Sequence, residues 1–99
     1  IKAMPTKEMK CEAEGKILYE FTPVRGITKD GKDWERRDYV METSERYHSK
    51  MRFSMTSFEG PVDSPLSVGD VIRLRFVVEA FQKENKWYNN VKALSIERL

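Results

Sequence analysis

Residues 71–80 have the sequence VIRLRFVVEA, and this stretch indicates how the chain folds. Its even positions are all apolar, whereas its odd positions include Arg73, Arg75 and Glu79. Alternation with a period of two residues is typical of a β-strand that buries one face and exposes the other to water. Residues 87–96 are also rich in aromatic and β-branched residues, and a polar tip separates the two runs. We therefore expect a long antiparallel hairpin here.

The composition favours a small binding module. The 99 residues allow one domain with one modest core and little room for an internal active-site cavity. Eighteen Lys and Arg against 16 Asp and Glu give a formal net charge of +2, well short of the strongly basic character that by itself signals nucleic acid. An anionic partner would therefore have to recognise how the charges are arranged.

The chain carries no sign of secretion or of a membrane anchor. No apolar run is long enough for a signal peptide or a membrane span, so we expect a cytoplasmic protein that does not bind membranes. The single cysteine, Cys11, cannot form an internal disulfide. Only His48 could activate it as a nucleophile, so we interpret Cys11 as an inert residue in a polar tail.

The sequence predicts a short N-terminal tail followed by a single domain. Residues 1–12 follow no helical or strand period and are interrupted by Pro5, so we expect an N-terminal tail or arm there and a single domain at residues 13–99.

The domain begins with a strand and a loop. We expect the strand at about residues 13–24, where Gly15 suits a sharp bend or a bulge. The loop at residues 25–33 contains Asp30-Gly31, a strong turn signal between two strand-like runs. The first two strands should therefore be adjacent and antiparallel.

Two further strands precede a connector that proline interrupts. Residues 34–43 and 50–56 alternate apolar and polar side chains, which favours strands. Residues 57–65 are too short and too broken by proline for a proper helix, so we expect an irregular connector before the fourth strand. The apolar positions of the strands are our core candidates: Tyr39, Met41, Met51, Phe53, Met55 and Phe76.

This order of elements predicts an all-β protein. Five strands, with a long connector after the third and a hairpin at the end, fit a small closed sheet, because closure removes exposed strand edges. We therefore expect a five-stranded OB-fold barrel. An SH3-like barrel remains an alternative that the pattern alone does not exclude.

Several segments resemble a known family in the same order along the chain. They are Gly15-Lys16-Ile17, Asp30-Gly31-Lys32-Asp33-Trp34, Tyr39-Val40-Met41-Glu42-Thr43, Leu66-Ser67-Val68-Gly69-Asp70-Val71 and Lys86-Trp87-Tyr88-Asn89-Asn90-Val91-Lys92-Ala93-Leu94. The family is a small bacterial domain of unknown function related to single-stranded-DNA-binding proteins, and the resemblance covers roughly residues 12–97. It implies an OB fold and nucleic-acid binding.

The chain departs from the family pattern at three places. Asn85-Lys86 stands where relatives have Gly-Arg, Asn90 replaces an Asp, and Leu94 replaces a second Trp. Lys86 keeps the positive charge but lacks the planar guanidinium that stacks on bases.

A single-stranded nucleic acid needs cations for its phosphates and flat rings for its bases on one face. In an OB fold this face is formed by strands two and three together with the loops that join strands one to two and four to five. The residues that we expect there are Lys29, Lys32, Trp34, Arg36, Lys50, Arg52, Lys83, Lys86, Trp87 and Tyr88. Trp34 and Trp87 lie at strand ends, where a tryptophan can instead close the core, and both interpretations stay open.

These features favour a non-enzymatic module that binds single-stranded nucleic acid with little sequence preference, DNA before RNA. No nucleophile–base pair, metal cluster or phosphate loop is visible, so we expect no catalytic residue, metal or cofactor. The alternative is a protein-interaction or assembly module in which the same barrel pairs edge to edge through its hairpin and Tyr88 or Phe58. A homodimer or another small homo-oligomer is compatible with either function.

Overall fold

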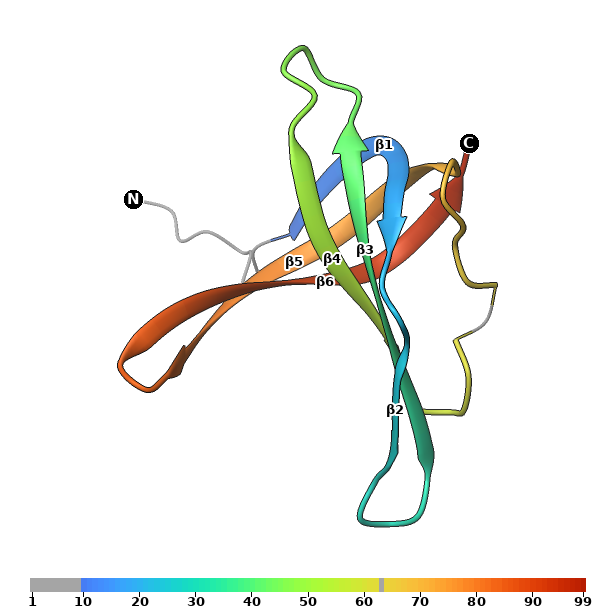
Figure 1. Ribbon diagram of the computed structural model, residues 1–99, viewed down its shortest axis with the longest axis vertical. Helices are drawn as coiled ribbons and strands as arrows, with labels where there is room; N and C mark the ends of the chain where they lie inside the picture. Colours follow the sequence, from blue (N-terminus) through green and yellow to red (C-terminus); the bar gives the residue numbers. More distant parts are fainter. Residues whose placement is uncertain (1–9, 63) are drawn as a thin grey trace, which may run out of the picture.

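The computed structural model describes residues 10–62 and 64–99, and within these residues it contains six β-strands and no helix (Figure 1). The strands are β1 (Lys10–Glu20), β2 (Val24–Ile27), β3 (Asp33–Thr43), β4 (Lys50–Ser57), β5 (Val71–Lys83) and β6 (Lys86–Arg98). They follow the sheet order β1-β5-β6-β4-β3-β2, and β1 pairs with β3 as well. Five strands therefore form a closed ring, and β2 is added to it at the outer edge of β3.

The predicted closed sheet with an irregular connector before a final hairpin is confirmed, but four strands and not three precede the connector, so the expected number of five strands is wrong. The predicted first strand at residues 13–24 is divided, because β1 ends at Glu20 and β2 begins at Val24. Pro23 stands at this break, where it cannot donate a hydrogen bond to a neighbouring strand. β2 then pairs with β3 inside the expected loop, so the two strands form a hairpin of their own.

The expected tail at residues 1–12 lies mostly outside the described residues. Its last three residues belong to β1 and pair with β5, where Cys11 lies opposite Phe76. Cys11 is half-buried and packs against the core, so its predicted place in a polar tail is wrong. The long β5 provides the partner that extends β1 toward the N-terminus.

The core lies inside the ring and agrees with the period-two pattern. Its buried side chains are Ile17, Tyr39, Met41, Phe53, Leu66, Ile72, Leu74 and Phe76, with Met51 and Met55 packed against them. Full burial of one large apolar side chain contributes about 1.5–3 kcal/mol. Toward the hairpin tip the pattern no longer indicates burial, since Ala80 is exposed because β5 and β6 have left the body of the molecule (Figure 1).

A β-bulge in β1 changes which side chains face the core. Ile17 lies opposite Met41, but Tyr19 lies opposite Val40, so Leu18 is an extra residue in β1. Such an insertion reverses the alternation of side chains between the two faces. Tyr19 and Phe21 therefore lie on the outer face of the ring, opposite to Ile17.

Gly15 lies where β1 passes from one neighbour to the other. It is opposite Ile72 of β5 and Thr43 of β3, so the ring closes at this residue. A Cβ on Gly15 would collide with the carbonyl oxygen of Glu42 and lie 2.9 Å from the Cα of Thr43. Both are backbone atoms, which no side-chain rotation can move away.

We expect Gly15→Ala to destabilise the protein by about 1–3 kcal/mol or more, because the added methyl group forces β1 and β3 apart. Urea denaturation followed by circular dichroism measures this change. Gly31→Asn is the control, since Gly31 has a φ of +81° with open space around its Cα, and asparagine tolerates that conformation. Equal stability of Gly15→Ala and the wild type would contradict this account of ring closure.

Candidate nucleic-acid interface

The outer face of β3 and β4 carries charged side chains in register. Val40 lies opposite Arg52, Asp38 opposite Ser54 and Arg36 opposite Thr56. These residues alternate with core residues on both strands, so they share the side of the sheet that faces away from the core.

The β5–β6 hairpin borders this face and forms a groove with it. β4 and β6 touch through one parallel pairing, between Ser54 and Lys92, and the Ser54 hydroxyl donates a 3.3 Å hydrogen bond to the carbonyl of Val91. On one side of this junction lies a cavity of about 360 Å³, which we call the groove; it is lined by Arg36, Asp38, Arg52, Phe53, Ser54, Phe81, Tyr88, Asn89, Asn90 and Val91.

Two stacked aromatic rings form the hairpin side of the groove. Phe81 and Tyr88 are opposite each other in the β5–β6 pairing, with ring centroids 5.5 Å apart and an angle of 25° between the ring planes. Both side chains are exposed, at 46% and 45%. Flat, partly exposed rings that support each other are suited to stacking on a planar ligand.

The strand side of the groove carries a cation held on another aromatic ring. The guanidinium carbon of Arg52 lies 4.1 Å from the centroid of the Phe21 ring, a cation–π contact. Tyr19 packs its ring edge to face against Phe21 at 4.8 Å. The bulge at Leu18 is what brings these two rings to the outer face.

Asp38 lies between the two arginines of the groove. Its Oδ2 accepts hydrogen bonds from Nη2 and Nε of Arg52 at 2.8 and 3.3 Å. Its Oδ1 lies 3.2 Å from Nε of Arg36, but that N–H is not directed at it, so Oδ1 is buried without a hydrogen bond among the described residues.

Of the ten predicted site residues, Arg36, Arg52 and Tyr88 line the groove. Trp34 lies on the same face of β3 as Arg36, but it lines a separate cavity with Gly60 and Pro61. Its indole lies closely over Gly26, since a Cβ there would be 2.6 Å from the ring. Trp34 is therefore half-buried against its hairpin partner, outside both the core and the groove.

Trp87 does not close the core, because 68% of it is exposed. It is opposite Gln82 and next to Tyr88, so it lies on the other face of the hairpin from the groove. A core role for Trp87 is wrong, since this part of the hairpin projects beyond the body of the molecule (Figure 1).

The predicted lysines lie outside the groove. Lys29 and Lys32 are at the end of the β2–β3 hairpin, and Lys83 and Lys86 are at the end of the β5–β6 hairpin. All four are exposed and form no ion pair with the carboxylates of the described residues. Lys50 lies 3.9 Å from Glu42, so its charge is partly balanced. In Figure 1 the two hairpins project from the body in different directions.

Phe81 is the groove residue that the sequence could have indicated. It has the same parity as the outward Arg73, Arg75 and Glu79, and it lies opposite Tyr88 in the predicted hairpin. Tyr19 and Phe21 had no such signal, because no glycine or other local feature marks the bulge at Leu18.

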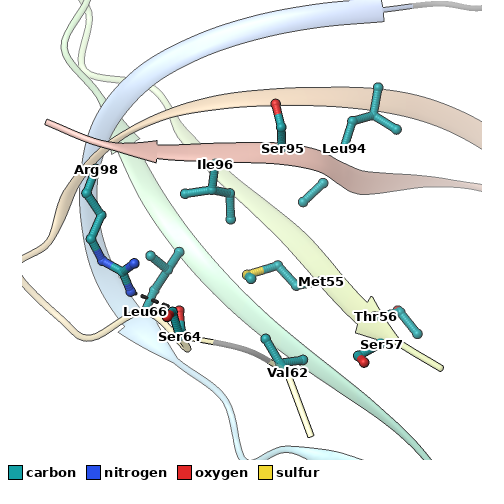
Figure 2. A pocket seen from close by; sticks show the side chains of 11 residues that line it. Met55, Thr56, Ser57, Val62, Ser64, Leu66, Leu94, Ser95, Ile96 and Arg98 are labelled. Carbon is teal, nitrogen blue, oxygen red and sulfur yellow. Dashed lines mark hydrogen bonds between the residues drawn. The ribbon is translucent and has the colours of Figure 1, made fainter. Parts of the chain in front are cut away.

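A second cavity lies on the other side of the Ser54–Lys92 junction (Figure 2). Here β4 and β6 separate, and the connector closes the floor with Val62 and Leu66. The cavity has a volume of about 420 Å³ and is lined by Met55, Thr56, Ser57, Val62, Ser64, Leu66, Ala93, Leu94, Ser95, Ile96 and Arg98. It contains none of the predicted site residues.

The described residues contain no group of three or more His, Cys, Asp and Glu side chains that could hold a metal ion. In the same part of the chain, no helix is long and apolar enough to cross a membrane.

Residues 12–97 match the model of a family described as Domain of unknown function (DUF3127). The chain belongs to the DUF3127 family. The resemblance over residues 12–97 is thereby confirmed. No curated protein matches the sequence.

The DUF3127 domain is similar to solved single-stranded DNA-binding proteins. Rim1, a mitochondrial protein of this kind from S. cerevisiae, has been solved in two crystal forms. One gives a TM-score of 0.62 at 12% identity and covers 94% of this chain and 97% of its own. The other gives 0.60 at 10% identity and covers 95% of this chain and 96% of its own. A small single-stranded DNA-binding protein from Streptomyces coelicolor gives 0.52 at 17% identity, covering 94% of this chain and 95% of its own. At such identities the likeness shows the fold alone, and the expected structural likeness to single-stranded DNA-binding proteins is confirmed.

A buried carboxylate holds the β2–β3 arm of this DUF3127 domain in place. Glu35 is 1% exposed. Its Oε1 accepts hydrogen bonds from the backbone N–H of Val62 at 2.9 Å and from Nε of Arg37 at 2.8 Å, and its Oε2 accepts one from Nε of Arg25 at 2.6 Å. The Val62 N–H first, and then Arg25 and Arg37, lower the pKa of the Glu35 carboxyl from 4.5 to about 2. One side chain thus joins β2, β3 and the connector.

We expect Glu35 to make the folded state more stable above pH 4.5 and to lose that contribution as the pH falls to about 2, because the unfolded chain takes up the proton at the higher pH. Glu35→Gln should be less stable at neutral pH and should lose less stability over this range. Urea midpoints measured at a series of pH values test this. Glu20→Gln, at an exposed position, is the control. Parallel pH profiles for Glu35→Gln and the wild type would refute the assignment.

Proposed function

We propose that this DUF3127 domain binds single-stranded DNA in the groove, with low sequence specificity and without catalysis. The observation that carries the proposal is the stacked pair Phe81–Tyr88, which shares one cavity with Arg36 and Arg52. Rings and cations on one surface are what a single strand requires, because bases stack on the rings while phosphates meet the cations.

The geometry favours a single strand over a duplex. The bases of a duplex are stacked on each other, and only an unpaired strand can offer the flat face of a base to Phe81 or Tyr88. All bases have such a face, so stacking gives little sequence preference. The fold likeness to single-stranded DNA-binding proteins supports DNA before RNA.

The lysines at the end of the β5–β6 hairpin supply a second contribution, whereas Asp30 and Asp33 balance Lys29 and Lys32 on the other arm. Lys83 and Lys86 extend the hairpin that carries the stacked rings, and with Glu84 they leave one net positive charge there. A strand that leaves the groove along this hairpin would bring its phosphates near these two lysines. Long-range attraction to them would raise the association rate and would weaken with added salt.

We expect Tyr88→Ala to raise the Kd for a labelled thirty-nucleotide oligo-dT about 5- to 150-fold, which corresponds to about 1–3 kcal/mol for one stacked base. Fluorescence anisotropy at low salt measures the Kd. Trp87→Ala is the matched control, because it removes a neighbouring and more exposed ring from the opposite face of the hairpin.

An equal loss of oligo-dT affinity in Trp87→Ala and Tyr88→Ala would show that the groove is not the binding site. Failure of the wild type to bind the oligonucleotide at low salt would overturn the proposed function itself. Circular dichroism of each variant keeps a folding defect distinct from a binding defect.

A protein-assembly function is the second candidate, and the cavity in Figure 2 is the observation that favours it. Beyond Ser54 and Lys92, the facing edges of β4 and β6 have no strand partner among the described residues. Unpaired edges beside an apolar floor are a place where a strand of a second copy could add. Leu94 lies at this cavity as the extra residue of β6, and it is 53% exposed.

If copies pair here, the molar mass from light scattering should rise with concentration toward that of a dimer, and Leu94→Glu should restore the monomer mass. The charge added to an apolar contact opposes its burial. Val68→Glu is the control, since Val68 is similarly exposed but lies outside this cavity. A wild type that stays monomeric at every concentration would exclude this function.

A further inference from the structure

We propose that Asp38 makes the groove select strands that carry bases over other polyanions. This inference rests on the proposed function and adds a specificity-determining residue to it. Asp38 is a positioning residue here, because it acts through the two arginines that it holds.

Asp38 and a phosphate would compete for the guanidinium of Arg52. Its Nε and Nη2 both donate to Oδ2 of Asp38, at 3.3 and 2.8 Å. Two N–H groups on one edge of a guanidinium are also what a phosphate binds in a bidentate manner. A phosphate can therefore use this edge only by displacing Asp38.

The carboxylate of this ion pair is more buried than its two arginine partners. The Asp38 side chain is 13% exposed, whereas those of Arg36 and Arg52 are 46% and 58% exposed. Water and salt screen a carboxylate in this position less than they screen an ion pair on the open surface. The two arginines and Asp38 together carry a net charge of one, so the groove wall attracts a bare polyanion weakly.

Stacking of a base on the rings of the groove does not compete with Asp38. The rings of Phe81 and Tyr88 are exposed and carry no charge, so a base can stack on them while Asp38 keeps its contacts. Phe21 covers one side of Arg52, at 4.1 Å, and Asp38 occupies its Nε and Nη2 edge. Stacking of its bases therefore contributes more to the affinity of a ligand than contacts to its phosphates do.

The unused oxygen of Asp38 agrees with this role. Among the described residues Oδ1 is buried without a hydrogen bond, although it forms an ion pair with Nε of Arg36 at 3.2 Å. A buried acceptor without a donor lowers stability. A carboxylate that served stability alone would be better placed with both oxygens satisfied, as in Glu35.

The chain offers a matched control on the same strand. Asp33 is exposed at the start of β3, forms no ion pair with the cations of the described residues and does not line the groove. Asp33→Asn and Asp38→Asn change the net charge equally, so a difference between them reports the position of the charge.

The experiment titrates each protein against a labelled thirty-nucleotide oligo-dT and against an abasic strand with the same number of phosphates, at several salt concentrations. We expect Asp38→Asn to bind the abasic strand several-fold more tightly and to lower the ratio of oligo-dT affinity to abasic affinity. Its log–log salt slope for the abasic strand should steepen by about 0.7–1.4, one or two added phosphate contacts. Asp33→Asn should change the affinities for the two ligands by the same factor.

Equal ratios and slopes for the two variants would overturn the inference and leave the proposed function standing. Failure of the wild type to bind either strand would overturn both. Should Asp38→Asn not fold, Asp38→Ser removes the same charge with a smaller side chain, and we expect it to lower the same ratio. An unchanged ratio in folded Asp38→Ser would also count against Asp38.

Discussion

Closure of the sheet at Gly15 is the constraint on which the other features depend. β1 is the only strand that pairs with both β5 and β3 among the described residues, and it changes partner where no side chain fits. Closure buries the apolar faces of all five ring strands around one core without a covering helix in the part described. It also forces β6 against β4, where a single pairing at Ser54 divides the groove from the second cavity.

The placement of carboxylates explains why the surface of this chain is nearly balanced in charge. Glu35 pairs with Arg25 and Arg37, and Asp38 pairs with Arg36 and Arg52, so the charges of these arginines are partly neutralised close to the body of the molecule. At the hairpin ends, Asp30 and Asp33 balance Lys29 and Lys32, whereas Lys83 and Lys86 beside Glu84 leave one net positive charge. The two acids differ, because both oxygens of Glu35 accept hydrogen bonds, whereas Oδ1 of Asp38 accepts none from the described residues.

The core and the order of elements could be predicted because burial imposes a period of two on each strand, as in Ile72, Leu74 and Phe76. Three features escaped this pattern. The bulge at Leu18 depends on how β1 fits β3, a tertiary property with no local signature. β2 forms because the residues after Pro23 pair with the free edge of β3. Trp87 is exposed because its strand extends past the core. Periodicity predicts which face of a strand a side chain lies on, but it does not show how far that part of the strand lies from the core.

The same bulge connects the fold to the proposed site. Without the extra residue, Tyr19 and Phe21 would continue the core face of Ile17, and Arg52 would have no ring to pack on. With it, three strands contribute to one outer surface: Tyr19 from β1, with Phe21 directly after that strand, Asp38 and Arg36 from β3, and Arg52 from β4. The hairpin then adds its stacked rings from β5 and β6. In the function that we propose, a surface of this kind, rich in rings and nearly balanced in charge, favours ligands with flat faces, so unpaired bases would fit it better than a dense array of phosphates.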